Sequence, residues 1–122
     1  MSVPLKIYTL AQCSTCRDAT KWLRARGYEF DERAIRETPP TLPELRAMRA
    51  AHDGNLRKLF NSSGLEYRAQ KLSEKFPALA ESEQLALLAG NGRLVKRPFL
   101  VGPGVALVGF DEGKWAAALP KK

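Results

Sequence analysis

The feature that most constrains this chain is a pair of cysteines set between an apolar run and a helical stretch. Cys13-Ser14-Thr15-Cys16 directly follows the apolar run 5–10, and a helical pattern continues over 16–26. A thiol pair at a strand-to-helix turn is typical of a redox site. The first cysteine lies where helical N–H groups lack partners and the macrodipole is positive, so its thiolate is favoured. Cys13 is therefore the predicted nucleophile, with Arg17 as a candidate neighbouring cation.

The spacing of the two cysteines predicts a second role. Residues three apart on a helix lie on one face at about 5–6 Å, which is within the Cα separation that a disulfide tolerates. Cys16 can therefore resolve an adduct formed on Cys13. A purely structural disulfide is disfavoured, because closing so short a loop removes little entropy from the unfolded chain. A zinc site needs about four ligands, whereas the sequence offers two cysteines and His52, so we expect no metal and no bound cofactor.

Length and charge narrow the class of protein. The chain has 122 residues, 44% of them hydrophobic, which suits a single domain over 1–122. We expect a cytoplasmic protein without a membrane segment, because no apolar run approaches about 20 residues and the N-terminus lacks a signal-peptide pattern. The net charge of +7 favours acidic partners or oxyanions. The basic residues are scattered among acidic ones, so we do not expect direct nucleic-acid binding.

The first third of the chain predicts a β-α-β unit. The run 5–10 reads as a strand, 16–26 as a helix ended by Gly27, and 28–31 alternates like a second strand. The sequence Thr41-Leu42-Pro43-Glu44 is a capping box that predicts a helix through about residue 51.

The remainder of the chain predicts a helical block followed by a hairpin. Helical patterning continues to Gly92 and includes 82–89, closed by Gly90, which indicates an all-helical insertion over about 41–92. Two short apolar runs, 98–101 and 105–108, form a predicted hairpin, and Asp111 caps a last helix. The order favours an α/β thioredoxin-like fold with a mixed sheet.

Arg97-Pro98, at the start of the third predicted strand, is the second informative element. A proline at this place is either an ordinary strand-start residue or the carrier of a cis bond that leaves a backbone edge free beside the thiols. The dithiol upstream favours the cis bond.

Four segments together resemble the arsenate reductase-like family of the thioredoxin superfamily, which includes the ArsC, Spx and YffB types. They are Tyr8-x4-Cys13-Ser-Thr-Cys16-Arg17, the segment 59–68, Lys96-Arg97-Pro98, and Val108-Gly109-Phe110. The resemblance covers nearly the whole chain. It implies a glutaredoxin-like core with a helical insertion, Cys13 as nucleophile, and Arg97 beside it with a cis Pro98.

The same resemblance disfavours arsenate as the natural substrate. Glutaredoxin-linked arsenate reductases hold their oxyanion with three arginines, and of these Arg97 alone clearly matches. The other two positions fall near Asn61 and Gly109, with Arg68 or Arg93 as candidates to substitute in space. Those reductases also tend to have a single active-site cysteine, whereas this chain has two.

Three functions follow as hypotheses. The first is a thiol-disulfide oxidoreductase in which Cys13, Cys16 and Arg97 act on a small thiol or disulfide substrate. Glutathione, glutaredoxin or thioredoxin would be the external reductant. Substrate contacts are predicted for Ser14, Thr15, Arg17, Arg97 and Pro98. The second is an Spx-type redox-sensing regulator that binds the RNA polymerase α subunit, and the third is a glutaredoxin-linked arsenate reductase that acts on an oxyanion.

Overall fold

A four-stranded mixed sheet forms the centre of the protein. The computed structural model describes residues 5–61 and 64–119. The strands are β1 (Leu5–Thr9), β2 (Phe30–Ala34), β3 (Phe99–Gly102) and β4 (Val105–Val108), in the spatial order β2-β1-β3-β4. β1 is parallel to β2 and antiparallel to β3, and β3 is antiparallel to β4. The fold is the predicted α/β thioredoxin-like fold with a mixed sheet.

The helix after the first strand, α1 (Ser14–Ala25), begins earlier than the sequence predicted. Cys13 is its N-cap residue, so both thiols belong to the helix start. Gly27 ends the helix in the left-handed region at φ 81°, as predicted. Its N–H donates to the Arg24 carbonyl, and the Tyr28 N–H donates to the Leu23 carbonyl, which is the Schellman pattern.

The predicted second strand, 28–31, was placed two residues too early. The Tyr28 N–H belongs to the end of α1 and its side chain is buried in the core beneath that helix. Strand pairing therefore starts at Phe30, opposite Leu5, and continues to Ala34, opposite Thr9. β2 lies at the edge of the sheet, and its charged residues suit an edge strand.

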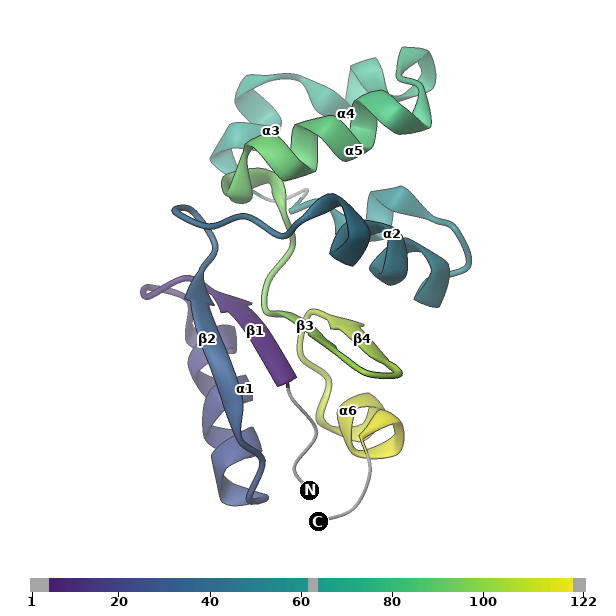
Figure 1. Cartoon of the computed structure of the whole chain (residues 1–122). Helices are drawn as coiled ribbons and strands as arrows, with labels where there is room; N and C mark the ends of the chain where they lie inside the picture. The colour runs from purple at the N-terminus through teal and green to yellow at the C-terminus, as the bar shows by residue number, and fades with distance from the viewer. Residues whose placement is uncertain (1–4, 62–63, 120–122) are drawn as a thin grey trace.

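The alternation of β1 sends its side chains into two separate cores. Leu5 and Ile7 pack with α1 and with α6 (Glu112–Ala118) on one face of the sheet. Tyr8 lies in the other core, together with α2 (Leu42–Ala51) and the helices that follow it. Figure 1 shows α1 and α2 on opposite sides of the sheet.

Between β2 and β3 the chain is helical. After α2 come the 3₁₀ helix η1 (Leu56–Leu59), then α3 (Leu65–Ala69), α4 (Leu72–Lys75), η2 (Phe76–Ala78), α5 (Glu81–Gly90) and η3 (Gly92–Leu94). Gly90 was expected to close α5 but is its last residue, with Asn91 as the C-cap. In Figure 1 the block α3–α5 lies beyond the carboxyl ends of β1 and β2.

A polar cluster joins the sheet to α2. The predicted capping box is present, with Thr41 accepting from the Glu44 N–H and the Glu44 carboxylate accepting from the Thr41 N–H. The same carboxylate accepts from the Tyr8 hydroxyl at 2.6 Å and pairs with the Lys6 ammonium at 3.1 Å. One carboxylate therefore caps the helix and ties it to β1.

The C-terminal part follows the predicted order. β3 and β4 form the hairpin, although β3 begins at Phe99 and Pro98 precedes it. The Asp111 carboxylate accepts the Lys114 N–H and caps α6. Trp115 is buried and its indole N–H donates to the Gly109 carbonyl, which fixes α6 to the end of β4.

Gly92 is a test of how the helical block joins the sheet. A Cβ at this position would lie 1.8 Å from the carbonyl oxygen of Ile35, just after β2, whereas a Cβ on Gly90 would meet nothing within 4 Å. We expect Gly92→Ala to lower the free energy of unfolding by at least about 2 kcal/mol, because backbone must move. Urea unfolding followed by tryptophan fluorescence measures this.

Gly90→Ala is the matched control and is expected to change the unfolding free energy by no more than about 1 kcal/mol. Equal effects of the two substitutions would contradict the close approach of Gly92 to the chain after β2.

Candidate active site

The turn after β1 holds Cys13 with its sulfur directed at the start of α1. The Cys13 N–H donates to the Leu10 carbonyl, and the Cys13 carbonyl accepts from the Arg17 N–H. With φ −92° and ψ 112°, the N-cap residue is extended, and its Sγ accepts the Cys16 N–H at 3.2 Å. Sulfur thus occupies the place that a serine or aspartate oxygen takes in an ordinary helix cap. A negative charge on Cys13 would be stabilised by this N–H group and by the positive end of the helix.

The two thiols differ in access to solvent. Cys13 is half-buried, whereas Cys16 is 2% exposed and faces the protein interior one turn later. Both are free thiols. Burial, followed by the hydrogen bond with Cys13, raises the pKa of the Cys16 thiol to about 12. Cys16 is therefore a neutral thiol at physiological pH, and Cys13 is the thiol placed to react first.

Arg97 and Pro98 lie at the end of β1 that leads to the dithiol turn, because β3 pairs with β1. Tyr8 at the end of β1 is opposite Phe99, the first residue of β3. The Arg97–Pro98 bond is cis, as the resemblance implies, and Pro98 is buried while Arg97 is half-buried. The positive charge of Arg97 acts on Cys16 and opposes the rise in that thiol's pKa.

The remaining predicted contact residues lie on the first turn of α1. Ser14 and Thr15 are exposed beside Cys13. Arg17 is also exposed, and its guanidinium donates to the Ala11 carbonyl at 3.2 Å. That bond fixes Arg17 on the turn that precedes Cys13. Arg97 is a cation whose charge acts on Cys16, and sequence reasoning placed it beside Cys13 through the resemblance.

The two positions near which the family's other oxyanion-binding arginines fall, Asn61 and Gly109, carry no charge, as the sequence indicated. Gly109 has φ 70°, and a Cβ there would lie 3.1 Å from Cε and 3.6 Å from Nζ of Lys96. The Lys96 side chain therefore occupies the space beside Gly109. Lys96 was part of the segment that carried the resemblance, but no role was predicted for it. Its position next to Arg97 was the feature that could have indicated one. Arg68, in α3, and Arg93, in η3, are both exposed.

The described residues include no cluster of side chains suited to bind a metal ion. Within 5–61 and 64–119, no group of three histidine, cysteine, aspartate or glutamate side chains could hold a metal ion. His52 is the C-cap of α2 and is partly buried. Its ring Nδ1 lies 2.8 Å from the Met48 carbonyl and donates to it.

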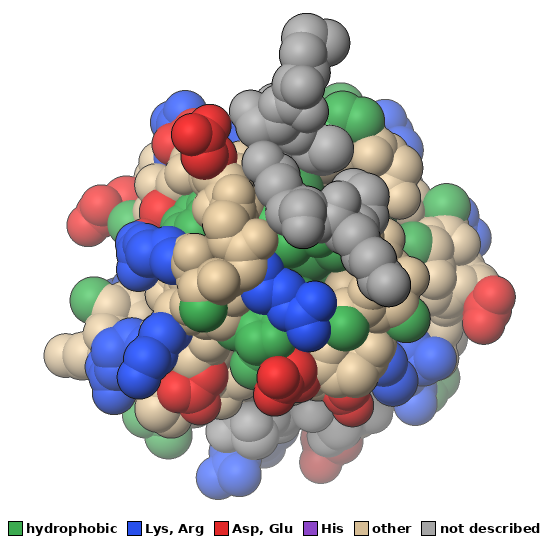
Figure 2. Space-filling model, turned by 90° about the horizontal axis from the view of Figure 1, so that it is seen from below, with side chains coloured by type: hydrophobic (Ala, Val, Ile, Leu, Met, Phe, Trp, Pro, Cys, Tyr) green, Lys and Arg blue, Asp and Glu red, His purple; other side chains and the backbone are tan. Residues whose placement is uncertain are grey.

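Surface charge is mixed rather than segregated on the face seen in Figure 2. There, lysine and arginine side chains are interspersed with aspartate and glutamate. In the described part of the chain, no helix is both long and apolar enough to cross a bilayer.

Comparison with known proteins decides the family. The sequence matches the ArsC family over residues 8–118. The chain belongs to the ArsC family. It is 42% identical to the uncharacterised protein YusI of Bacillus subtilis, over 91% of this chain and 94% of that protein.

A crystal structure and a regulator extend the comparison. The structure of an ArsC-family-related protein from Bacteroides fragilis superposes with a TM-score of 0.87 at 41% identity, covering 94% of this chain and 97% of that one. The global transcriptional regulator Spx of Enterococcus faecalis is 28% identical, over 96% of this chain and 87% of that protein. Relatives of this chain therefore include a transcriptional regulator.

The different environments of the two thiols lead to a reactivity prediction. We expect iodoacetamide to modify Cys13 at least about 100-fold faster than Cys16 near neutral pH, since Cys16 is buried and has a pKa of about 12. The measurement labels the wild-type protein with limiting iodoacetamide over a range of pH, and digestion with mass spectrometry gives the rate at each cysteine. The Cys16 rate should rise about tenfold per pH unit without a plateau up to about pH 10. Equal rates, or a Cys16 midpoint near about 8.5, would contradict the assignment.

Proposed function

We propose that this protein is a thiol-disulfide oxidoreductase that uses Cys13 as nucleophile and Cys16 as resolving thiol. The observation that carries the proposal is the hydrogen bond from the Cys16 N–H to Cys13 Sγ at the helix start. It places a partly exposed sulfur where an anion is stabilised, with a buried second thiol three residues away.

In the first step, the Cys13 thiolate attacks one sulfur of a substrate disulfide. A bond forms between Cys13 and that sulfur, and the other half of the substrate leaves as a thiolate. Helix N–H groups and the Arg97 charge favour this step by stabilising negative charge near the reacting sulfurs.

In the second step, Cys16 loses its proton and attacks the Cys13 sulfur, which releases the second half of the substrate as a thiolate. The negative charge of Cys13 is one of the causes that hold the pKa of Cys16 high, and adduct formation removes it. The Arg97 charge, which lowers the pKa of Cys16, remains. Cys16 is therefore neutral before a substrate reacts, and it becomes easier to ionise once an adduct has formed on Cys13.

The cycle ends with a Cys13–Cys16 disulfide that an external dithiol or two thiols must reduce. Glutathione, glutaredoxin or thioredoxin would supply these electrons. The protein itself needs no bound cofactor in this scheme, because both electrons come from its own thiols.

An oxidation experiment tests the resolving role of Cys16. Mild oxidation or reaction with a small disulfide should give the intramolecular Cys13–Cys16 disulfide as the main product, since the two residues are three apart at a helix start. Mass spectrometry after alkylation distinguishes the monomer with an internal disulfide from a disulfide-linked dimer and from a mixed disulfide. A stable mixed disulfide on Cys13 with Cys16 still free would assign resolution to another molecule.

Arg97 should contribute to the reaction with every substrate, because its charge acts on Cys16, the resolving thiol. We expect Arg97→Ala to slow reduction of a small disulfide at least about tenfold. Arg46→Ala, which removes an exposed arginine on α2, is the matched control and should leave the rate unchanged.

Little arsenate reduction is expected with glutathione and glutaredoxin, because this chain has one matching arginine where the arsenate reductases hold their oxyanion with three. Arsenate turnover of about 1 per second or more would favour an arsenate reductase instead.

A second candidate function is a redox-sensing transcriptional regulator. The similarity to Spx over 96% of this chain favours it. In this case the Cys13–Cys16 disulfide would be a switch, and the partner would be the RNA polymerase α subunit. A pulldown with purified α subunit, using the reduced and the oxidised protein, discriminates the two functions. Binding that depends on the thiol state, together with slow disulfide turnover, would favour the regulator.

A further inference from the structure

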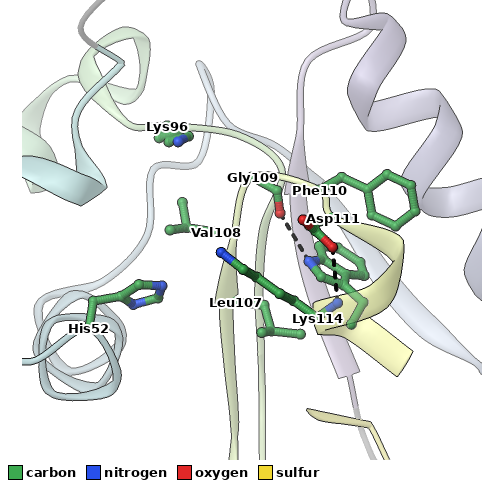
Figure 3. A pocket seen from close by; sticks show the side chains of 9 residues that line it. His52, Lys96, Leu107, Val108, Gly109, Phe110, Asp111 and Lys114 are labelled. Atoms are coloured by element: carbon green, nitrogen blue, oxygen red, sulfur yellow. Dashed lines mark hydrogen bonds between the residues drawn. The ribbon is translucent and has the colours of Figure 1, made fainter. Parts of the chain in front are cut away.

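A pocket of about 260 Å³ opens at the end of β4, apart from the dithiol turn. It lies between the C-terminal end of α2 and the start of α6, and Figure 3 shows its lining. His52 comes from α2, Lys96 from the segment before β3, Val108 from β4 and Lys114 from α6. The proposed chemistry uses none of these side chains.

The pocket carries a surplus of positive charge. In Figure 3 the Lys114 side chain extends from α6 across the pocket toward His52, and Lys96 lies on another side. Among the described residues, neither ammonium group forms an ion pair. Asp111 is the acidic side chain in the lining, and its Oδ1 accepts the Lys114 N–H as the cap of α6. The lining therefore has two ammonium groups and one carboxylate, and that carboxylate is already engaged with a helix end.

Apolar contacts and fixed geometry accompany this charge. The buried Trp115 lies at the pocket, held by its hydrogen bond to the Gly109 carbonyl. The His52 ring is oriented by its Nδ1–H bond to Met48, which leaves Nε2 available as a hydrogen-bonding atom. A carboxylate with a short aliphatic stem suits such a site, because the stem contacts apolar walls and the charge meets the lysines.

The sheet places the pocket at the strand end that leads to the dithiol turn. Tyr8 is opposite Phe99, and Phe99 is opposite Val108, so these residues form a row across β1, β3 and β4. Strands lie about 4.8 Å apart, which puts Val108 about 10 Å from the end of β1 that leads to Cys13. The Gly109 N–H also donates to the Pro98 carbonyl at 2.9 Å, so the pocket wall is bonded to the cis proline beside the thiols.

We propose that this pocket binds the carboxylate of an acidic side chain in a peptide or protein disulfide substrate whose cysteine reacts with Cys13. The proposal rests on the proposed oxidoreductase function and adds the substrate class to it. The pocket lies at the same end of the sheet as the turn that carries Cys13, so the preferred substrate has a glutamate or aspartate within a few positions of its cysteine.

The chemical step is the exchange already described, with an acidic peptide as substrate. Cys13 thiolate bonds to one substrate sulfur and the other peptide leaves as a thiolate. Cys16 then gives its proton to a released peptide thiolate and displaces the peptide bonded to Cys13, so the substrate gains two electrons and the protein is left with its internal disulfide. Lys96 and Lys114 bind the substrate and take no part in bond exchange.

The test compares two synthetic disulfides. One is the disulfide-linked dimer of the acetylated and amidated peptide Glu-Gly-Cys-Gly-Glu, and the other replaces both glutamates by glutamine. Reduced protein is mixed with each, and the second-order rate is followed by mass spectrometry. We expect the acidic peptide to react at least about tenfold faster, and Lys114→Gln to bring the two rates to within about threefold. Lys75→Gln, an exposed lysine on α4 outside the pocket, has the same net charge and should retain the preference.

The outcomes separate this proposal from the function on which it rests. Fast reaction of both peptides at equal rates would overturn the pocket assignment and leave the oxidoreductase function standing. The same holds if Lys75→Gln lowers the preference as much as Lys114→Gln, because the effect would then come from net charge alone. Absence of reaction with either peptide would overturn both.

Discussion

The hydrogen bond from the Cys16 N–H to Cys13 Sγ is the interaction on which the rest of the site depends. It makes a sulfur atom the cap of α1, so that the helix that supports the sheet also stabilises the reactive group. The same turn places Cys16 under the helix start, where burial raises its pKa to about 12. One local structure therefore creates two unequal thiols, and this inequality sets the order of the steps in the proposed exchange.

The sheet brings distant parts of the sequence to that turn. Because β3 pairs antiparallel with β1, Arg97 and the cis Pro98 lie at the end of the strand that leads to Cys13. The Gly109 N–H bonds to Pro98, and Trp115 bonds to Gly109, so the start of α6 is joined to the same edge. Residues about 80 to 100 positions apart in sequence thus share one end of the fold, and substitutions at these bonds should affect chemistry as well as stability.

Local signals in the sequence predicted most of the elements, and tertiary bonds explain the errors. The capping box at Thr41, the hairpin before Val108 and the cap at Asp111 each rest on neighbouring residues, and all three are present. The second strand was placed too early because Tyr28 alternates like a strand residue, yet its N–H completes the end of α1. The pocket was not predicted, because Lys96 and Lys114 are brought together by β3, β4 and α6 rather than by spacing. The thiol pair could be recognised from spacing and context, whereas the charge of Arg97 acting on Cys16 depends on strand pairing.

Trapping of the covalent intermediate tests the central claim most directly. Cys16→Ser retains the helix cap at Cys13 but lacks the resolving thiol. Its reaction with the peptide disulfide in which glutamine replaces glutamate should therefore stop at a mixed disulfide on Cys13. Digestion and mass spectrometry locate the peptide, and Cys13→Ser, treated in the same way, should carry at most about one hundredth as much adduct. An adduct on Cys16 of Cys13→Ser, with none on Cys13 of Cys16→Ser, would contradict the account.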